Sequence, residues 1–115
     1  TAAHWQIRAV TDPANRGVWL DGDKLGSIGI TVRRGVSFHG LALNVNTDME
    51  PFGWINPCGL DRVRMTSFER YLGHRVSMKT ARQVMAESLA GSLGLEVTKR
   101  SLAQLCECLG LSAGV

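Results

Sequence analysis

The sequence contains no long apolar run, since none of its hydrophobic stretches approaches the roughly eighteen residues of a membrane-spanning helix. Its first residues do not show the basic and then apolar pattern of a secretory signal. An initial Thr1 suggests that the natural chain begins further upstream, which leaves room for a targeting segment. We therefore expect no membrane partner, and a cytoplasmic location that would become mitochondrial in a eukaryotic source.

Cysteine is scarce, with three residues in the chain, and an odd number argues for reduced thiols in a cytosol-like compartment. The spacing of Cys106 and Cys108 does not match a zinc knuckle, and no second Cys or His pair accompanies them. We therefore expect no metal and no cofactor. In a helix, Cys106 would share a face with three leucines and belong to the core, while Cys108 would face solvent.

Charge is nearly balanced, because 13 Lys and Arg against 10 Asp and Glu leave a net charge of +3. No run of basic residues interleaved with aromatic ones is present, so nucleic acid is not an expected partner. A length of 115 residues with 44% hydrophobic residues is sufficient for one domain with a buried core. We expect a single domain over residues 1–115.

Strand patterns dominate residues 4–59 and helix patterns dominate residues 66–110, which predicts an α+β fold around an antiparallel sheet. Alternation predicts the strands, with a hairpin turn at Asp21-Gly22. A capping box at Thr66 and Glu69 predicts the start of the first helix. The expected strands cover residues 4–10, 18–20, 24–33 and 36–45, a turn or single helical turn covers 51–55, and the helices cover 66–72, 77–93 and 101–109.

Two residues can perform chemistry that ordinary packing does not need: Cys58, in the turn Pro57-Cys58-Gly59, and Lys24, beside the hairpin turn. A thiol becomes a useful nucleophile when a nearby cation stabilises its thiolate. Taken alone, a Cys in such a turn is more often structural, by about three to one. A lysine beside a hairpin turn is usually solvated and contributes little to the core, so both interpretations stay open at this point.

The two long strands carry unusually small residues at Gly26, Ser27 and Gly29, which usually marks a bulge or a ligand lying against the backbone. On the returning strand, Gly40 leaves a similar gap between His39 and Asn44. These two polar residues either satisfy neighbouring backbone groups or meet a substrate.

Taken together, five segments of the sequence resemble the lipoyl (octanoyl) transferases, which move octanoyl from acyl carrier protein to lipoyl domains. The resemblance is carried by residues 17–22 (GVWLDG), 24–30 (KLGSIGI), 33–35 (RRG), 39–45 (HGLALNV) and 56–59 (NPCG), and continues more weakly over residues 63–72. The segments occur in the family's order, and the separation of Lys24 from Cys58 is similar to that of the family's catalytic pair.

The resemblance implies a two-step transfer in which Cys58 holds the acyl group as a thioester and Lys24 lowers the thiol pKa and moves protons. It also implies the partners: octanoyl-acyl carrier protein, the lipoyl domains of 2-oxoacid dehydrogenases, and the glycine cleavage H protein. The acyl group would be contacted by two triplets, Ser27, Ile28 and Gly29 on one strand and Gly40, Leu41 and Ala42 on the other.

The fold implied is that of the biotin and lipoate protein ligases, which is related to the core of class II aminoacyl-tRNA synthetases. The chain lacks the Arg-Gly-Gly and His-Gly-Pro-Gly segments found in the upstream part of the family. We therefore expect it to be similar to the C-terminal half of such an enzyme. The alternative function is a non-catalytic remnant that binds carrier or lipoyl domains without turnover.

Overall fold

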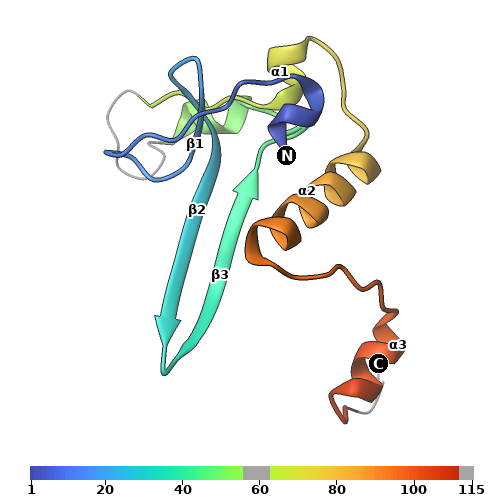
Figure 1. Ribbon diagram of the computed structural model, residues 1–115. Helices are drawn as coiled ribbons and strands as arrows, with labels where there is room; N and C mark the ends of the chain where they lie inside the picture. Colours follow the sequence, from blue (N-terminus) through green and yellow to red (C-terminus); the bar gives the residue numbers. More distant parts are fainter. Residues whose placement is uncertain (56–62, 112–115) are drawn as a thin grey trace. The chain divides into compact units, whose positions relative to one another are not determined.

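The computed structural model describes residues 1–55 and 63–111, which form two compact units, Thr1–Val84 and Met85–Val115. The first unit holds every strand of the described chain (Figure 1). Helix α2 (Met78–Leu93) begins in the first unit and ends in the second. The candidate site lies in the first unit.

The sheet of the first unit has three antiparallel strands in the order β1 (Val18–Leu20), β2 (Asp23–Arg33) and β3 (Val36–Leu43). Each hairpin is closed by a two-residue loop in which both central residues have positive φ, as type I′ turns require. These loops are Asp21-Gly22 and Arg34-Gly35, so the predicted hairpin turn at Asp21-Gly22 is confirmed, as are the strands at 18–20 and 24–33.

The core of this unit lies at the end of the sheet where β1 meets the start of β2. Leu25 and Phe68 are fully buried at its centre, and aliphatic side chains from the N-terminal segment and from α2 complete it. Its buried members are Ile7, Leu20, Leu25, Val45, Phe68, Val76 and Ala81. The core therefore joins β1 and the start of β2 to the helices that follow the sheet.

The predicted strand at residues 4–10 is wrong. The segment instead begins with the 3-10 helix η1 (Ala2–Trp5), which ends at Gln6 in the left-handed conformation. The ring of Trp5 packs against that of Phe68 at 5.2 Å, and Ile7 enters the core. Only Val10 pairs with the sheet, through backbone hydrogen bonds to Trp19, because burial of Trp5 and Ile7 draws the preceding residues away from the strand edge.

The returning strand ends at Leu43, two residues earlier than predicted. Asn44 and Val45 instead join the sheet to α1 (Phe68–Leu72): the carbonyl of Asn44 accepts from the backbone N–H of Phe68, and that of Val45 accepts from Glu69. The predicted helical turn is confirmed as the 3-10 helix η2 (Glu50–Trp54).

Helix α1 is capped by Ser67, whose hydroxyl accepts from the backbone N–H of Arg70, and not by Thr66 as predicted. Thr66 is buried, and its N–H donates to the carbonyl of Lys24. Thr66 is therefore bonded to the sheet and does not cap the helix. The predicted end at Gly73, in the left-handed conformation, is confirmed. So is the start of α2, where the Ser77 hydroxyl accepts from the N–H of Thr80.

The second unit contains the end of α2, followed by Gly94, and helix α3 (Leu102–Cys108). The predicted start of the last helix at Ser101 is confirmed, and Ser101 and Gln104 form a capping box there. Cys108 is exposed as expected, but Cys106 is only half-buried and its leucine neighbours are exposed, so its assignment to a core is wrong. No helix in residues 1–55 and 63–111 is both long enough and apolar enough to cross a membrane.

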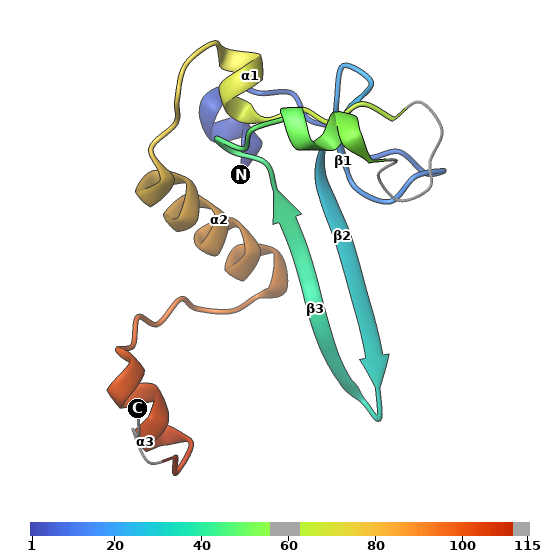
Figure 2. The same ribbon diagram turned by 180° about the vertical axis from the view of Figure 1, so that it is seen from behind.

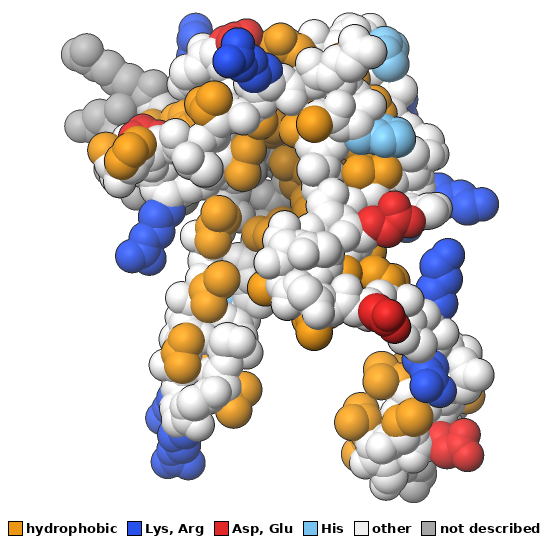
Figure 3. Space-filling model, viewed as in Figure 1, with side chains coloured by type: hydrophobic (Ala, Val, Ile, Leu, Met, Phe, Trp, Pro, Cys, Tyr) orange, Lys and Arg blue, Asp and Glu red, His pale blue; other side chains and the backbone are white. Residues whose placement is uncertain are grey.

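Beyond Gly26, the β2–β3 hairpin extends away from the core, as two opposite views show (Figures 1 and 2). Among the described residues, this part of β2 pairs only with β3. Hydrophobic side chains follow the hairpin and basic ones mark its tip (Figure 3). Ile28, Ile30 and Val32 alternate along β2 on one face and are 42%, 60% and 67% exposed. An isolated two-stranded ribbon is marginally stable in water, so this one is suited to a covering partner.

Candidate active site

Lys24 is buried, with 4% of its surface exposed, although it stands at the beginning of β2 beside a hairpin turn. Its backbone N–H donates to the carbonyl of Arg64 at 2.7 Å, and its carbonyl accepts from the N–H of Thr66 at 2.9 Å. These bonds place residues 64–66 alongside β2 in the parallel direction. The interpretation of Lys24 as a solvated hairpin lysine is therefore wrong, because the returning chain covers it.

The amine of Lys24 lies over the ring of Trp19, with Nζ 5.6 Å from the ring centroid. An aromatic face attracts a cation through its quadrupole, which offsets part of the cost of taking an ammonium group out of water. Trp19 is itself buried and is paired with Lys24 across β1 and β2. The lysine is thus held in one place by both its backbone and its side chain.

Farther along the same strand, small residues line one face of the hairpin. The register pairs Ser27 with Ala42 and Gly29 with Gly40, so these four positions face the same side. A Cβ added to Gly29 or to Gly40 would have no heavy atom of the described chain within 4 Å. Over this face lies an open hollow of about 460 Å³. The small residues therefore leave space that no side chain of residues 1–55 and 63–111 fills.

The hollow is lined by all of the predicted acyl-contact residues except Ile28. Ile28 does not line the hollow, although Leu41, its partner across β2 and β3, does. Three further lining residues were missed by the sequence analysis: Arg16, Ile30 and Thr31. Thr31 could have been found from its alternation with Ser27 and Gly29, whereas nothing in the sequence pointed to Arg16.

The two polar candidates of the returning strand, His39 and Asn44, occupy different environments. His39 is exposed and lines the hollow, and it takes a positive φ of 71° within β3, a conformation that is uncommon for a residue with a side chain. Asn44 does not line the hollow. Its backbone N–H donates to Leu25 and its carbonyl accepts from Phe68, so it belongs to the connection between the sheet and α1.

Cys58 and its neighbours Asn56, Pro57 and Gly59 lie outside the described residues. The chain on the two sides of this segment converges, because Phe52 and Gly53 of η2 line a hollow of about 210 Å³ together with residues 63–65. Residues 64–66 are also the ones bonded to Lys24. The segment that carries Cys58 is therefore followed directly by chain that lies beside the buried lysine.

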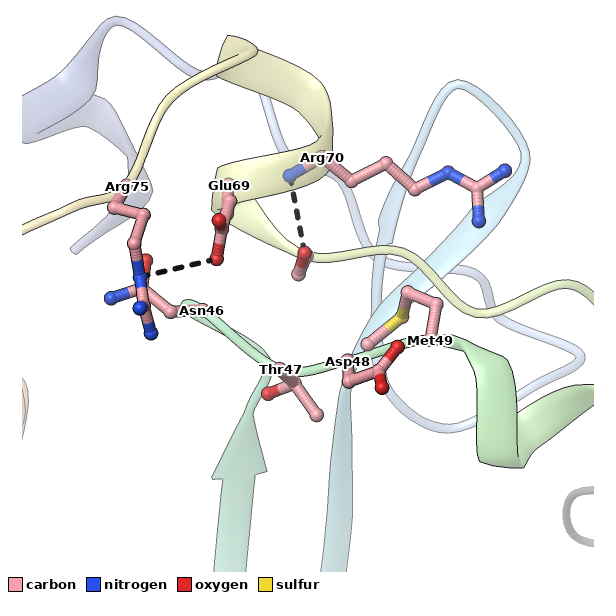
Figure 4. A pocket seen from close by; sticks show the side chains of 8 residues that line it. Asn46, Thr47, Asp48, Met49, Glu69, Arg70 and Arg75 are labelled. Carbon is pink, nitrogen blue, oxygen red and sulfur yellow. Dashed lines mark hydrogen bonds and ion pairs between the residues drawn. The ribbon is translucent and has the colours of Figure 1, made fainter.

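A further hollow of about 430 Å³ lies between residues 46–49 and α1, and Figure 4 shows it from close by. Its polar groups largely satisfy one another. The amide of Asn46 exchanges two hydrogen bonds with the backbone of Val76, and Arg75 forms an ion pair with Glu69 at 3.7 Å. These contacts fix α1 to the sheet, and we assign them a structural role.

No group of three or more His, Cys, Asp or Glu residues in the described part of the chain is arranged to hold a metal ion. The chemistry available there comes from one buried amine and an apolar hollow along the same strand.

Residues 1–90 match the sequence model of the family described as the lipoyl protein ligase A/B catalytic domain. The chain belongs to this family. The resemblance found in the sequence is therefore confirmed, and the three-stranded antiparallel sheet with its helices agrees with the α+β fold class expected for part of such a domain.

Several curated relatives in this family are octanoyltransferases. That of Desulfotalea psychrophila is 58% identical over 74 residues, which are 63% of this chain and 33% of the relative. That of Syntrophobacter fumaroxidans is 45% identical over 99 residues, covering 86% and 43%. That of Haemophilus influenzae is 36% identical over 99 residues, covering 85% and 47%. The chain thus spans between a third and a half of the length of these relatives.

The glycines of this lipoyl protein ligase A/B family member should differ in what they tolerate. Gly26→Val should lower the free energy of unfolding by about 1–3 kcal/mol, because its Cβ would lie 2.9 Å from the carbonyl oxygen of Ala42. Gly29→Val, whose side chain enters open space, should change it by less than about 0.5 kcal/mol. Urea unfolding followed by circular dichroism measures both. Equal losses would show that Gly29 serves the sheet and does not keep the hollow open.

Proposed function

We propose that this chain carries the catalytic pair of an octanoyltransferase. Cys58 is the acyl-accepting nucleophile and Lys24 is the group that stabilises its thiolate and transfers protons. The acyl group would come from octanoyl-acyl carrier protein and go to a lysine of a lipoyl domain, either of a 2-oxoacid dehydrogenase or of the glycine cleavage H protein. The relatives' names support octanoyl transfer in general, and the chain's own residues supply the reasons for the assignment.

The reaction proceeds in two displacements. The Cys58 thiolate attacks the carbonyl carbon of the donor thioester, a new C–S bond forms, and the carrier thiolate leaves and takes up a proton. The lysine amine of the acceptor domain then attacks the Cys58 thioester, an amide bond forms, and Cys58 leaves as thiolate while the amine loses a proton. Dividing one acyl transfer in this way predicts ping-pong kinetics. Lys24 would hold and return the protons.

The observation that carries the proposal is the burial of Lys24 beside the chain that follows Cys58. A lysine that is only 4% exposed is rare, since burying a cation is costly. Its bonds to Arg64 and Thr66 join it to the residues directly after the Cys58 segment. Buried ionisable groups of this kind are typical of functional sites.

The hollow over the small-residue face provides a place for the acyl chain. An octanoyl tail removes about six methylenes from water on burial, each worth about 0.8 kcal/mol, or roughly 5 kcal/mol in all. An alkyl chain lying along Gly29 and Gly40 could approach the backbone closely, because neither position carries a Cβ. The hollow is open to solvent on one side, so we expect other parts of an octanoyltransferase domain to cover it and to recover more of that free energy.

The second candidate function is a remnant that binds carrier or lipoyl domains without turnover. It is favoured by the short span of the chain relative to its relatives. A remnant has no need of an activated thiol, so the reactivity of Cys58 at neutral pH separates the two functions.

After incubation with octanoyl-acyl carrier protein, we expect the protein to gain one octanoyl group on Cys58 that is labile to hydroxylamine. Intact mass followed by peptide mapping measures it. Cys106 and Cys108 are internal controls, because both belong to α3 in the second unit whereas Lys24 belongs to the first, and both should remain unmodified. Acylation of a Cys58→Ala variant, or alkylation of Cys58 no faster than of Cys108, would contradict the assignment.

Gly40→Val should raise the KM for octanoyl donors and leave the KM for acetyl or butyryl donors nearly unchanged. The added methyl groups would occupy the hollow where only the longer tail lies. Initial rates with carrier proteins of several acyl chain lengths measure the effect. An equal loss at every chain length would mean that Gly40 does not contact the acyl tail.

A further inference from the structure

The side chain of Lys24 is enclosed by two residues that the proposed chemistry does not use. The ring of Trp19 lies beneath its amine, at 5.6 Å, and Trp19 is 7% exposed. Gly17, which is also buried, lies against the end of the lysine's aliphatic stem. Both come from the short segment at the start of β1, so one local structure forms two sides of the lysine's surroundings.

Any side chain at position 17 would collide with Lys24, so only glycine fits there without moving the lysine. Its φ of 146° is one that residues with a side chain rarely adopt. A Cβ at this position would lie 2.8 Å from Cε of Lys24 and 2.6 Å from the carbonyl oxygen of Gly26. The backbone oxygen cannot give way easily, so an added methyl group would displace the lysine side chain.

The indole of Trp19 is itself fixed. Its Nε1–H donates to the carbonyl of Asn15 at 3.0 Å, and the side-chain amide of Asn15 donates to the carboxylate of Asp12 at 2.8 Å. The same carboxylate accepts from the backbone N–H of Ala14. These hydrogen bonds from Asn15 and Ala14 hold the pKa of Asp12 below its usual value. The loop before β1 therefore sets the plane of the ring on which the amine rests.

We propose that Trp19 and Gly17 are positioning residues for Lys24. Trp19 provides the aromatic face over which the amine lies, and Gly17 provides the gap through which the stem passes. A free lysine side chain samples many rotamers, and these two contacts reduce them to the few that keep Nζ over the ring. The importance of this for catalysis rests on the proposed function, whereas the positioning itself can be measured without any acyl transfer.

The positioning can be tested by the rate at which acetic anhydride acetylates each lysine of the native protein, measured by peptide mass spectrometry. Lys79 and Lys99 are exposed and serve as references. In the unaltered protein, Lys24 should react at least about tenfold more slowly than Lys79, because its amine must first be released from cover. Trp19→Leu and Gly17→Ala should remove most of that protection, while Trp19→Phe, which retains an aromatic face, should retain most of it.

Gly22→Ala is the matched control. Gly22 also has a positive φ, of 86°, but a Cβ there would have no described heavy atom within 4 Å, so the change strains the backbone without touching Lys24. It should leave the acetylation of Lys24 slow. Thermal melting shows whether each variant is folded, and where one of Trp19→Leu and Gly17→Ala is not folded, the other decides.

Equal acetylation rates for Lys24 and Lys79 in the unaltered protein would overturn the proposal. So would unchanged protection in folded Trp19→Leu and Gly17→Ala, or the same loss of protection in Gly22→Ala.

The alkylation rate of Cys58 is the second readout. It should fall in Trp19→Leu and be restored in Trp19→Phe. If Lys24 is released while the alkylation of Cys58 is unchanged, the positioning stands and the proposed pairing of Lys24 with Cys58 fails.

Discussion

The burial of one cation organises the described site. Lys24 lies at the point where β1, β2 and the chain returning at residues 64–66 meet, and it is bonded to the last of these on both sides of its backbone. A buried ammonium group costs free energy unless its surroundings compensate. Here the ring of Trp19 provides part of that compensation, and Gly17 provides the room. The packing around Lys24 thus holds its amine in one place, although lysine is rarely buried in proteins.

The open hollow lies along the same strand, β2, that carries Lys24. Because β2 continues from Lys24 into the small residues Ser27 and Gly29, a buried amine and an open apolar hollow belong to one continuous element. The exposed apolar side chains of β2 and the open hollow along the hairpin both indicate a ribbon suited to further covering structure. Membership in the lipoyl protein ligase A/B family, with relatives of which this chain matches less than half the length, is consistent with such a partner structure.

Much of the architecture followed from local patterns in the sequence. The two glycine-containing turns, the long strand from Lys24 and the caps at Ser77 and Ser101 are determined by nearest neighbours, so sequence alone could predict them. The wrong predictions concern residues whose structure is decided by contacts with residues distant in the sequence. Burial of Ile7 replaced a strand with a 3-10 helix, pairing of Thr66 with Lys24 moved the helix cap by one residue, and residues 64–66 covered a lysine that a hairpin turn alone would expose. Likewise, sequence identified the small residues of the hollow but could not show that Arg16 approaches it.

The most direct test of the central claim is the rate of Cys58 acylation by octanoyl-acyl carrier protein in Lys24→Met, compared with Lys24→Arg and the unaltered protein. Methionine retains an unbranched apolar stem over Trp19 while removing the amine, and melting curves establish that the variant is folded. The account predicts a loss of about a hundredfold or more in Lys24→Met. It predicts only partial recovery in Lys24→Arg, because arginine keeps the charge but cannot give up a proton. A folded Lys24→Met variant that acylates Cys58 at the unaltered rate would contradict it.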